Sequence, residues 1–564
     1  MPPPPGLGGE GASRATLRLV QITDVYTLEN FPALRTLIQE KRAELPPGCQ
    51  TVSVLTGDFL MPYLLSSLDK GRGMMAMLNA TPIDVVTWGN HECDLAHEHV
   101  LAREKEYKGV WINSNFTQHE SYANSKCQTD VHTIEVTSPD GENKRRVSLI
   151  GLLTDSPSLY RPDSFGGKAH LIEDPYATCK RMVEKLKDTC DLVVPLEHLY
   201  EPQDERMASE VDVPVLLSGH DHHVVDKVVN GTRILKPGSD GHRAVVLDLS
   251  WPTAGSDVQV EVSAEILAVK DFKPDPSLEQ VVKQAYAPLD GLLNTQLVEI
   301  PEAMRPLSSV GARDRRVSAG TFLLSEVREA LNAKSHTVDC VLVKGGNIRG
   351  GRTYEPDDPF TLESLKSEIS EGQELVICRV PGSVLRVGLQ ETWTAPNPGW
   401  FQYDDGISTD EGGFVTHVGG KPIDPERMYA IASVSDFFRA RDGPSFGKYF
   451  DDHPDERPDN DTGVVIHAIL LAHWADKAWK RVFQSIDVDS NGQISESEIR
   501  AIDINGDGFV DSNELVSALV RLGFKATPEE LTFVRAVLLA AGDADHDGRL
   551  SLSEINKAAV VGSC

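Results

Sequence analysis

The stretch IDVVTWGNHECD, residues 83–94, decides the fold class. An apolar run of strand length ends there at a glycine, and polar side chains follow it at once. Runs that are apolar on both faces are typical of central strands in a covered sheet, and amphipathic stretches lie between them. The sequence therefore predicts an α/β fold with a layered sheet core whose polar residues gather at one edge of one sheet. Five other apolar runs of strand length also end in Asp or His: LRLVQITD (17–24), TVSVLTGD (51–58), RVSLIGLLTD (146–155), DLVVPLEH (191–198) and VPVLLSGHDHH (213–223).

Changes of pattern divide the chain into several parts. After the layered domain the pattern relaxes into a helical stretch, and a second α/β (α+β) unit and a mostly helical region follow. The expected boundaries are a flexible Pro/Gly tail (1–15), the layered domain (16–270), a linker helix (271–305), the second α/β unit (306–450), an acidic linker (451–462) and an all-α region (463–564).

The composition is that of a globular protein with an acidic balance. The 564 residues carry 85 Asp plus Glu against 55 Lys plus Arg, a formal net charge of −30. Such a surface repels nucleic acid polymers and anionic lipid, so neither is expected as a partner. We find no transmembrane run and no secretory signal, and the eight cysteines form no CxxC pair. These features predict free thiols and a cytoplasmic location.

The polar residues at the strand ends form a set that suits a pair of metal ions. A carboxylate can bridge two cations, and imidazole and oxygen ligands complete each of them. Such a pair activates a water molecule and polarises a phosphoryl oxygen. The candidate ligands, in chain order, are Asp24, Asp58, Asn90, His198, His220 and His222.

The same residues resemble the calcineurin-like metallophosphoesterases. That family's order of motifs stands here as Asp24-Val25-Tyr26, Gly57-Asp58, Gly89-Asn90-His91-Glu92-Cys93-Asp94, His198 and Gly219-His220-Asp221-His222. The resemblance implies two divalent transition-metal ions (Mn, Zn or Fe), with Asp58 bridging them. It implies that Asp24 and His222 hold one metal, and that Asn90, His198 and His220 hold the other. Asn90 would also lie near the phosphate, and His91, oriented by Asp94, would assist the leaving oxygen.

One position departs from the family pattern. The family usually has histidine two residues after the first aspartate, and this chain has Tyr26. A phenol oxygen binds a divalent metal more weakly at neutral pH than an imidazole does, so the first metal is expected to be weaker, exchangeable or a different ion.

The layered domain followed by a second α/β unit resembles the 5′-nucleotidase family over residues 17–450. The loop KGGNIRGG (344–351) is similar to that family's Gly-rich loop, which implies that Gly346, Asn347 and Arg349 contact the substrate. The segment SDFFRARDG resembles one half of the aromatic clamp for a nucleobase, which implies that Phe437 or Phe438 stacks the base and Asp442 supports the loop. The other half should fall at 367–375, where no aromatic residue stands. A sugar-phosphate phosphatase, similar to those acting on mannosylglucosyl-3-phosphoglycerate, or a broad-range phosphatase therefore remains an alternative.

Three loops in the last hundred residues fit the EF-hand pattern for Ca²⁺. They are DVDSNGQISESE, DINGDGFVDSNE and DADHDGRLSLSE, each with Gly at position 6 and Glu at position 12. The second and third loops should pair, and the helix SESEIRAI must serve both the first and the second. The expected calcium ligands are Asp487, Asp489, Asn491, Gln493 and Glu498; Asp503, Asn505, Asp507, Phe509 and Glu514; and Asp543, Asp545, Asp547, Arg549 and Glu554, where position 7 binds through its carbonyl.

These features together predict a two-metal phosphomonoester hydrolase of the 5′-nucleotidase type with a calcium-binding EF-hand module. Its substrate would be a small phosphate ester such as a nucleoside 5′-monophosphate. A second alternative is a calcium-binding protein without activity, whose metal site has decayed at Tyr26. Calcium is expected either to regulate activity or to be structural.

Overall fold

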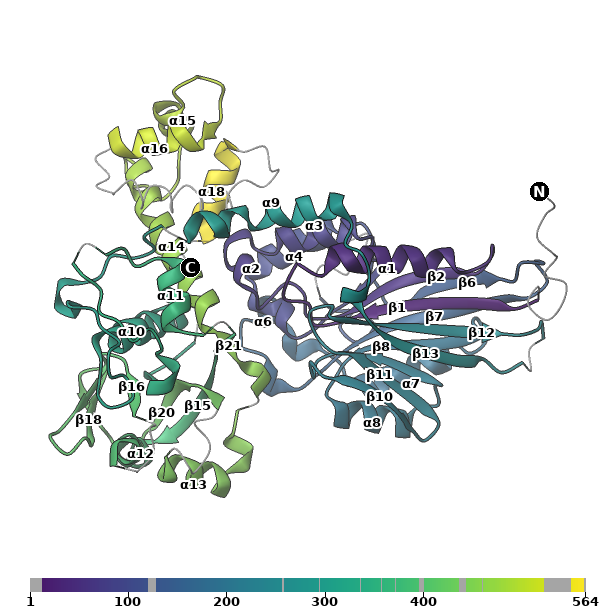
Figure 1. Ribbon diagram of the computed structural model, residues 1–564, viewed down its shortest axis with the longest axis horizontal. Coiled ribbons are helices and arrows are strands. Elements are labelled where there is room, and N and C mark those ends of the chain that lie inside the picture. The colour runs from purple at the N-terminus through teal and green to yellow at the C-terminus, as the bar shows by residue number, and fades with distance from the viewer. Residues whose placement is uncertain are drawn as a thin grey trace. The chain divides into compact units, whose positions relative to one another are not determined.

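The computed structural model describes residues 13–119, 128–255, 258–293, 295–334, 336–356, 358–370, 372–394, 400–435, 443–458, 460–521 and 549–561 (Figure 1). The chain divides into two compact units, one ending at Ala285 and the other beginning at Tyr286, with Ser67–Asp69 counted in the second. Most of the expected tail, 1–15, lies outside the described residues, and the first strand begins at Ala15.

The first unit is built on two sheets, and both are mixed. Parallel pairing at the centre of each sheet gives way to antiparallel pairing at one or both edges. The seven-stranded sheet has the order β13 (Glu261–Ala268), β12 (Arg243–Trp251), β1 (Ala15–Ile22), β2 (Gln50–Thr56), β3 (Val85–Thr87), β4 (Val110–Ile112) and β5 (Gln128–Thr129). The six-stranded sheet has the order β10 (Val224–Val229), β11 (Thr232–Pro237), β9 (Val215–Ser218), β8 (Leu192–His198), β7 (Lys144–Leu153) and β6 (His132–Thr137).

The core of this unit lies between the two sheets. Leu17 and Leu19 of β1 belong to the same buried cluster as Leu149 of β7 and Leu196 of β8. All eight residues of β1 are buried, which confirms the prediction of central strands covered on both faces. Alternate side chains of each strand point into this shared layer, because successive residues of a strand face opposite sides of its sheet.

Helices cover the outer faces of the sheets. On the six-stranded sheet, Cys179 and Met182 of α7 and Met207 of α8 pack with Ile150 and Leu216 of the strands. On the seven-stranded sheet, α1 buries one apolar face, which includes Phe31, Leu34 and Leu37. The helices of this unit are α1 (Phe31–Ala43), α2 (Leu64–Asp69), α3 (Arg72–Ala80), α4 (His97–Glu106), α6 (Ser164–Gly167), α7 (Pro175–Leu186) and α8 (Glu201–Glu210), and α9 (Pro276–Leu292) runs across the division into the second unit.

The second unit contains a five-stranded sheet and a small three-stranded sheet. The larger sheet has the order β16 (Phe401–Tyr403), β14 (Cys340–Lys344), β20 (Met428–Ser433), β15 (Glu374–Pro381) and β21 (Val464–Val465). The smaller one has β17 (Ile407–Thr409), β18 (Val415–Val418) and β19 (Lys421–Pro422). Its helices are α10 (Ser318–Ala333), α11 (Leu362–Glu368), α12 (Gly382–Thr394) and α13 (Pro444–Asp452).

The C-terminal helical region is joined to this sheet. The two residues of β21, just past the expected acidic linker, pair with β15, and α14 follows them directly. Loop strands β22 and β23 pair with each other, and the apolar sides of the helices form one cluster. The elements are α14 (Ile466–Ile486), α15 (Glu496–Ile502), β22 (Val510–Asp511), α16 (Ser512–Arg521), β23 (Arg549–Leu550) and α18 (Leu552–Val561).

Two further expectations concern membranes and thiols. Within the described ranges, no helix has the length and apolar character needed to span a bilayer. The described cysteines are all free thiols, as the sequence predicts, while Cys127 and Cys564 lie outside the described residues.

Candidate metal centre

The predicted metal ligands all follow strand ends, but they come from two sheets. Asp24, Asp58 and Asn90 follow β1, β2 and β3 of the seven-stranded sheet. His198 ends β8, and the Gly-His-Asp-His loop follows β9, both in the six-stranded sheet. The expectation of one edge of one sheet was therefore wrong. An apolar run indicates that a strand is covered, but it does not tell which strands pair.

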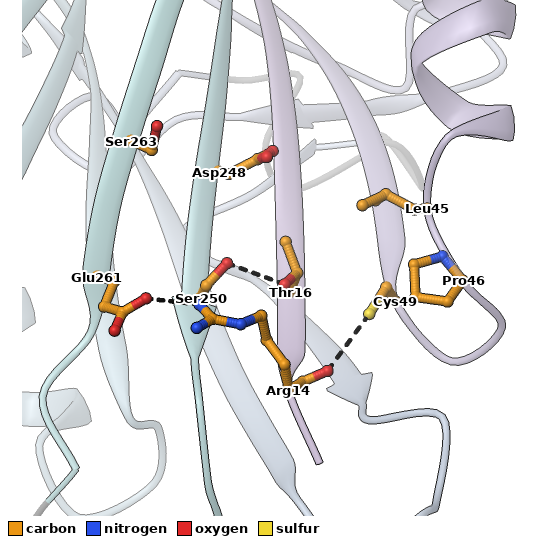
Figure 2. A pocket seen from close by; sticks show the side chains of 9 residues that line it. All are labelled: Arg14, Thr16, Leu45, Pro46, Cys49, Asp248, Ser250, Glu261 and Ser263. Atoms are coloured by element: carbon orange, nitrogen blue, oxygen red, sulfur yellow. Dashed lines mark hydrogen bonds and ion pairs between the residues drawn. The ribbon is translucent and has the colours of Figure 1, made fainter. Parts of the chain in front are cut away.

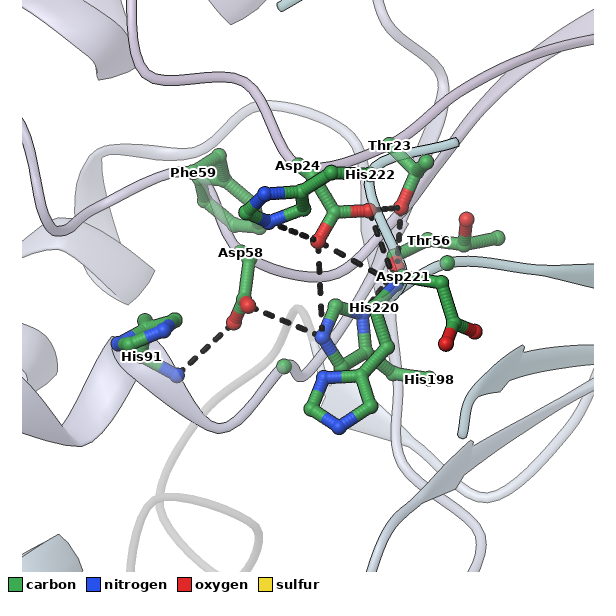
Figure 3. Close-up of polar contacts among 12 residues, drawn as sticks. Thr23, Asp24, Thr56, Asp58, Phe59, His91, His198, His220, Asp221 and His222 are labelled. Carbon is green, nitrogen blue, oxygen red and sulfur yellow. Dashed lines mark hydrogen bonds and ion pairs between the residues drawn. The ribbon is translucent and has the colours of Figure 1, made fainter. Parts of the chain in front are cut away.

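The ligand side chains converge on two buried aspartates (Figure 3). His198 Nε2 lies 3.0 Å from Asp58 Oδ2 and 3.8 Å from Asp24 Oδ1. His222 Nε2 lies 3.5 Å from Asp24 Oδ1. One ligand atom each of Asp58, His198 and His220 falls within a span of 4.8 Å. The geometry thus brings together carboxylates and imidazoles from four separate loops.

This donor set fits divalent first-row cations. Asp24 and Asp58 are fully buried, and a buried carboxylate must be compensated by positive charge. Imidazole nitrogens beside carboxylate oxygens suit zinc, iron and manganese. The fit therefore rests on the chemistry of the residues themselves.

Histidine protonation provides this compensation when no metal is bound. Burial alone would lower the pKa of His198, but the carboxylates of Asp58 and Asp24 raise it to about 10. The pKa of Asp24 is lowered in turn, because His198 and His222 outweigh its burial. An imidazolium lies where a metal would place its charge, so metal binding must displace a proton.

The backbone at the ligands is held in an uncommon conformation. Four of them have positive φ: Asp24 at 52°, Asp58 at 55°, His220 at 84° and His222 at 57°. Residues other than glycine rarely adopt this left-handed region, and they persist there where the surroundings impose it. The turns therefore aim these side chains at the cost of local strain, a pattern typical of functional sites.

The glycines of the motifs are required by close packing. A Cβ atom added to Gly89 would lie 2.1 Å from Asp58 Oδ1. One added to Gly219 would lie 2.1 Å from Thr23 Oγ1 and 3.0 Å from Asp24 Oδ2. The backbone approaches the two carboxylates so closely that no side chain fits there.

Tyr26, which stands where the resemblance leads us to expect histidine, has its phenol oxygen among the candidate ligands. Its phenol oxygen lies 3.0 Å from His222 Nε2, 3.3 Å from Asp58 Oδ2 and 3.5 Å from Asp24 Oδ1. The oxygen is therefore within reach of any cation held by these three residues.

A second chain of contacts holds His91. Its Nδ1 lies 2.7 Å from Asp94 Oδ2, and Asp94 Oδ1 accepts a bond of 2.8 Å from Arg161 Nη1. Burial raises the pKa of Asp94, but Arg161 and His91 outweigh it and lower this pKa to about 2. The His91 backbone N–H also donates to Asp58 Oδ1 at 2.8 Å. His91 is thus oriented by a permanent carboxylate next to the metal ligands.

The predicted substrate loop begins at the end of β14. Gly346 and Asn347 lie in a 3-10 turn, and Asn347 Nδ2 donates to Gln373 Oε1 at 2.6 Å. The Arg349 guanidinium is exposed, and among the described residues it donates only locally, to the Gly346 carbonyl at 3.1 Å. Phe437 and Asp442, the expected second half of the clamp, lie outside the described residues.

Two features of this loop escape sequence reasoning. Glu368, which is fully buried, accepts the Arg349 N–H through its carbonyl and the Gly350 N–H through its carboxylate. Trp400 accepts the Gly345 N–H at 2.6 Å, and its ring stacks on Trp393 with centroids 4.5 Å apart. An aromatic pair therefore adjoins the loop, although 367–375 contains none.

The calcium loops differ in how much of them is described. In the first, Asp487, Asp489 and Glu498 bring ligand oxygens within 4.8 Å of one another. In the second, Asp503 and Glu514 accept backbone N–H bonds of the loop. Of the third loop's expected ligands, Asp543, Asp545 and Asp547 lie outside the described residues, whereas Arg549 and Glu554 lie within them.

Pairing of the second and third loops is confirmed. Val510 of β22 pairs with Leu550 of β23 in antiparallel register. The side chain of Arg549 also reaches the second loop, where its Nη1 lies 2.8 Å from Asp507 Oδ2. As predicted, α15 is the only helix between the first and second loops, and all of that stretch is described.

Comparison with known proteins assigns the metal-binding part of the chain. Residues 17–224 match the calcineurin-like phosphoesterase family. This part of the chain is a calcineurin-like phosphoesterase domain. Residues 480–502 and 499–520 match the EF-hand family, so the C-terminal region contains EF-hands.

Curated relatives extend the likeness beyond the phosphoesterase domain. The chain is 21% identical over 417 residues to the trifunctional nucleotide phosphoesterase protein YfkN of Bacillus subtilis, covering 66% of this chain and 27% of that protein. It is 23% identical over 372 residues to the endonuclease YhcR of the same organism, covering 62% and 29%. The chain therefore spans less than a third of the length of these relatives.

Solved structures share the fold over most of the chain, including the phosphoesterase domain. The NAD nucleotidase of Haemophilus influenzae matches with a TM-score of 0.61 at 16% identity, covering 81% of this chain and 96% of that one. A putative 5′-nucleotidase of Staphylococcus aureus matches with a TM-score of 0.52 at 15% identity and the same coverage. At such identities the likeness concerns the fold.

Two positioning residues of the phosphoesterase domain went unrecognised in the sequence. Glu92 accepts backbone N–H bonds from Asp58, Phe59, Leu60 and Gly89, and thereby joins two ligand loops. Burial, followed by the charge of Asp58, raises its pKa to about 7. Its place inside the GNHE motif was a signal that could have revealed it.

Lys236 is the other such residue of the phosphoesterase domain. Its buried ammonium donates to the carbonyls of Leu199 at 2.7 Å and Gly219 at 2.8 Å, and pairs with Asp204 and Asp221. It ties the loop after His198 to the loop before His220. Nothing in the sequence around Lys236 marks this role, because the contacts come from other strands.

The phosphoesterase domain also has a pocket at the other end of β1 (Figure 2). It adjoins Thr16, whereas Asp24 follows the opposite end of the strand, about 25 Å away at the usual rise per residue. An Arg14–Glu261 ion pair and a Thr16–Ser250 hydrogen bond lie within it. No predicted ligand lines this pocket, so it is separate from the metal centre.

Proposed function

We propose that this protein is a metal-dependent phosphomonoester hydrolase of the 5′-nucleotidase type that also binds calcium. The observation that carries the proposal is the convergence of Asp24, Asp58, His198 and His222 beside the His91–Asp94 pair. Carboxylates and imidazoles for two cations, next to an oriented histidine, are the parts needed to hydrolyse a phosphate ester.

Each ligand has a proposed place. Asp58 would be shared by the two cations, Asp24 and His222 would hold one, and Asn90, His198 and His220 would hold the other. The cations, when bound, supply Lewis-acid activation of water and of a phosphoryl oxygen. The glycines around Asp24 and Asp58 keep the carboxylates fixed, so little reorganisation is needed when substrate arrives.

His91 is the proposed proton donor to the leaving oxygen. Asp94 accepts a hydrogen bond from Nδ1, so Nε2 on the other side of the ring is the atom that takes up the second proton when the imidazolium forms. Arg161 keeps Asp94 ionised, and an ionised Asp94 stabilises the imidazolium form of His91. The protonated ring then gives its Nε2 proton to the oxygen that departs from phosphorus.

The proposed substrate class is a nucleoside 5′-monophosphate. The shared fold with a NAD nucleotidase supports it, and so does the exposed guanidinium of Arg349, which suits a phosphate, carboxylate or base-edge acceptor. The lack of an aromatic residue in 367–375 favours a sugar phosphate or a broad range of monoesters instead. The cations are proposed to be Mn, Zn or Fe, with Ca²⁺ in the EF-hands.

Phosphate release from a panel of esters tests the proposal. The panel holds AMP, UMP, glucose 1-phosphate, 3-phosphoglycerate and p-nitrophenyl phosphate, assayed with Mn²⁺, Zn²⁺ or Mg²⁺, with and without Ca²⁺. We expect turnover of the nucleotides that His91→Ala abolishes. The matched control is His223→Ala, since His223 stands in the same loop as His222 but bonds to Glu201 at 2.8 Å.

Other outcomes select the alternatives. Equal or greater turnover of sugar phosphates would replace the nucleotidase with a general or sugar-phosphate phosphatase. No turnover with any metal, together with substoichiometric metal binding, would indicate a calcium-binding protein with a decayed centre. Equal turnover with and without Ca²⁺ would make the EF-hands structural rather than regulatory.

A further inference from the structure

A second cluster of potential metal ligands lies where α10 meets α14, within the second unit. Glu326 and Glu329 are one turn apart on α10, and His473 and Lys477 are one turn apart on α14. Residues three or four apart on a helix share a face, so each helix presents its pair to the other. One ligand atom each of Glu326, Glu329 and His473 falls within a span of 4.8 Å.

His473 is the side chain that this cluster leaves unsatisfied. It is buried, with 8% of its side chain exposed, and its Nε2 lies 3.8 Å from an oxygen of Glu326 and 3.8 Å from one of Glu329. Both distances are too long for a hydrogen bond, and within the described part of the chain Nε2 has no other partner. Burying a nitrogen without a hydrogen-bond partner costs free energy. Because Nε2 faces two carboxylates, a cation bound between the three groups would remove that cost.

The cluster has more negative than positive charge, which favours binding of a cation. Two carboxylates face one ammonium, because Lys477 Nζ lies 3.0 Å from Glu326 Oε2 and 2.9 Å from Glu329 Oε2. These three charged side chains therefore leave one negative charge uncompensated, and a neutral His473 imidazole would add a lone pair to the two carboxylates.

We propose that Glu326, Glu329 and His473 form a binding site for a divalent transition-metal ion of the zinc class. Ligand atoms around such an ion lie about 3–3.5 Å apart, since each metal–ligand bond is about 2.0–2.2 Å. The distances of 3.8 Å from His473 Nε2 to both carboxylates need only a small contraction. Imidazole nitrogen with two carboxylates selects zinc and its neighbours over calcium and magnesium, which take oxygen ligands alone.

Two residues next to the cluster, Trp474 and Lys477, contact its carboxylates. Trp474 Nε1 donates to Glu326 Oε2 at 2.8 Å, which orients one ligand in the way that outer hydrogen bonds orient the ligands of known metal sites. Lys477 has 38% of its side chain exposed, so its ammonium can move into solvent when a metal takes its place. Lys477 is thus a competitor of the metal for the same oxygens.

The position of the site gives it a structural consequence. The last residue of α14 is Ile486, and the first EF-hand loop begins at the next residue, Asp487. A metal joining α10 to α14 would cross-link the helix that enters this loop to the helix of the second α/β unit. This proposal does not depend on the phosphoesterase activity.

Zinc binding by the full chain tests the proposal. Wild type, His473→Ala and Glu329→Gln would each be dialysed to equilibrium against zinc in the presence of saturating Ca²⁺. The zinc bound per chain would then be measured. We expect each variant to lose one zinc equivalent per chain relative to wild type, while phosphate release stays unchanged. The control His453→Ala removes an exposed imidazole of the same unit, whose Nδ1 lies 2.9 Å from the local carbonyl of Tyr449, and it should keep the wild-type stoichiometry.

Lys477→Met separates a metal site from a simple ion-pair cluster. Removing a positive charge a few ångströms away should tighten zinc binding at this site about tenfold. If the cluster were only an ion pair between helices, the variant would gain no affinity. The control Lys448→Met breaks the exposed Lys448–Asp452 pair and should have no effect on zinc.

Two results would overturn the proposal. One is a His473→Ala variant that binds zinc with the stoichiometry and affinity of wild type. Its circular dichroism in the presence of chelator must match that of wild type, which shows that the variant is folded. The other is unchanged or weaker zinc binding by Lys477→Met. If His473→Ala fails to fold, the zinc affinity of Lys477→Met and the zinc stoichiometry of Glu329→Gln still test the proposal. The Glu329 side chain is 58% exposed, so its replacement leaves the core intact.

Discussion

The phenol oxygen of Tyr26 lies 3.0 Å from Nε2 of His222, so the residue that departs from the phosphoesterase pattern still points into the metal centre. A phenol keeps its proton at neutral pH, whereas a neutral imidazole offers a free lone pair, so the phenol is the weaker ligand for a divalent ion. The substitution changes the ligand without emptying its position.

Replacing Tyr26 with histidine should therefore strengthen the first metal. We expect Tyr26→His to bind Mn²⁺ or Zn²⁺ about tenfold more tightly, within the range that ligand changes produce at metal sites. The measurement is metal retained after dialysis against graded chelator. Tyr26→Phe, which removes only the oxygen, is the matched variant and should bind no better than wild type. Weaker retention by Tyr26→His would show that the phenol is the preferred ligand here.

Removing the charge of Asp94 should slow turnover without emptying the metal centre. Asp94→Asn leaves His91 less able to become an imidazolium, and we expect kcat to fall about 100-fold, since a general acid contributes roughly 10²–10⁴. Steady-state kinetics with metal analysis would separate the two effects. Asp163→Asn is the control, because Asp163 also lies near Arg161, at 3.6 Å, but belongs to no contact with His91. An unchanged kcat in Asp94→Asn would remove His91 from the proposed mechanism.

The same carboxylate should make the phosphoesterase domain sensitive to acid. The pKa of Asp94 in the folded protein is about 2, below the ordinary value of 3.8, so its ionised form stabilises the fold above pH 4. This stability is lost as the pH falls from about 4 toward 2, and it amounts to about 2 kcal/mol. Calorimetry of wild type and Asp94→Asn from pH 5 downward should show that wild type loses more of its free energy of unfolding than the variant does. Parallel losses would mean that Arg161 does not hold the carboxylate in solution.

Glu92→Gln should destabilise the phosphoesterase domain. The buried carboxylate accepts four backbone N–H groups, and an amide would turn an NH₂ group toward some of these donors. Leaving buried donors unpaired costs about 1–3 kcal/mol each, so the thermal unfolding midpoint should fall by several degrees. The exposed Glu98→Gln is the matched control. Equal midpoints for the two variants would contradict the role given to Glu92.

The second EF-hand should bind calcium more tightly once Arg549 is neutralised. The guanidinium of Arg549 lies 2.8 Å from Asp507, which occupies position 5 of the second loop. We expect Arg549→Met to raise the calcium affinity of that loop about tenfold, because a competing positive charge is removed. Calorimetric titration would measure this. Arg500→Met, which breaks only the helix-surface pair with Glu496, should change little.

Much of the fold was accessible from the sequence because its signals are local. An apolar run with polar residues at its end marks a strand and the position of a candidate ligand, as at Asp24 and Asp58. The EF-hand spacing marks a calcium loop, as at Asp487, since all the ligands come from one segment. Helices α1 and α7 show the apolar faces that their spacing predicts.

Contacts between distant segments were not accessible in this way. The sequence misplaced His198 on the same sheet as Asp58, and it contained no sign that Arg161 would hold Asp94 from 67 residues away. It also left Glu326 and His473 unconnected, although their helices meet. Pairing between strands and packing between helices depend on the whole chain, and no short window records them.

The sequence by itself determined which side chains end each strand and which loops have the EF-hand spacing, because both depend on spacing within a few residues. Only the tertiary structure decided that His198 lies 3.0 Å from Asp58, across 140 residues, and that Tyr26 points at His222. The physical reason is that two sheets must bury their apolar faces against each other. That packing brings their loops together at one end and selects which polar groups share a site.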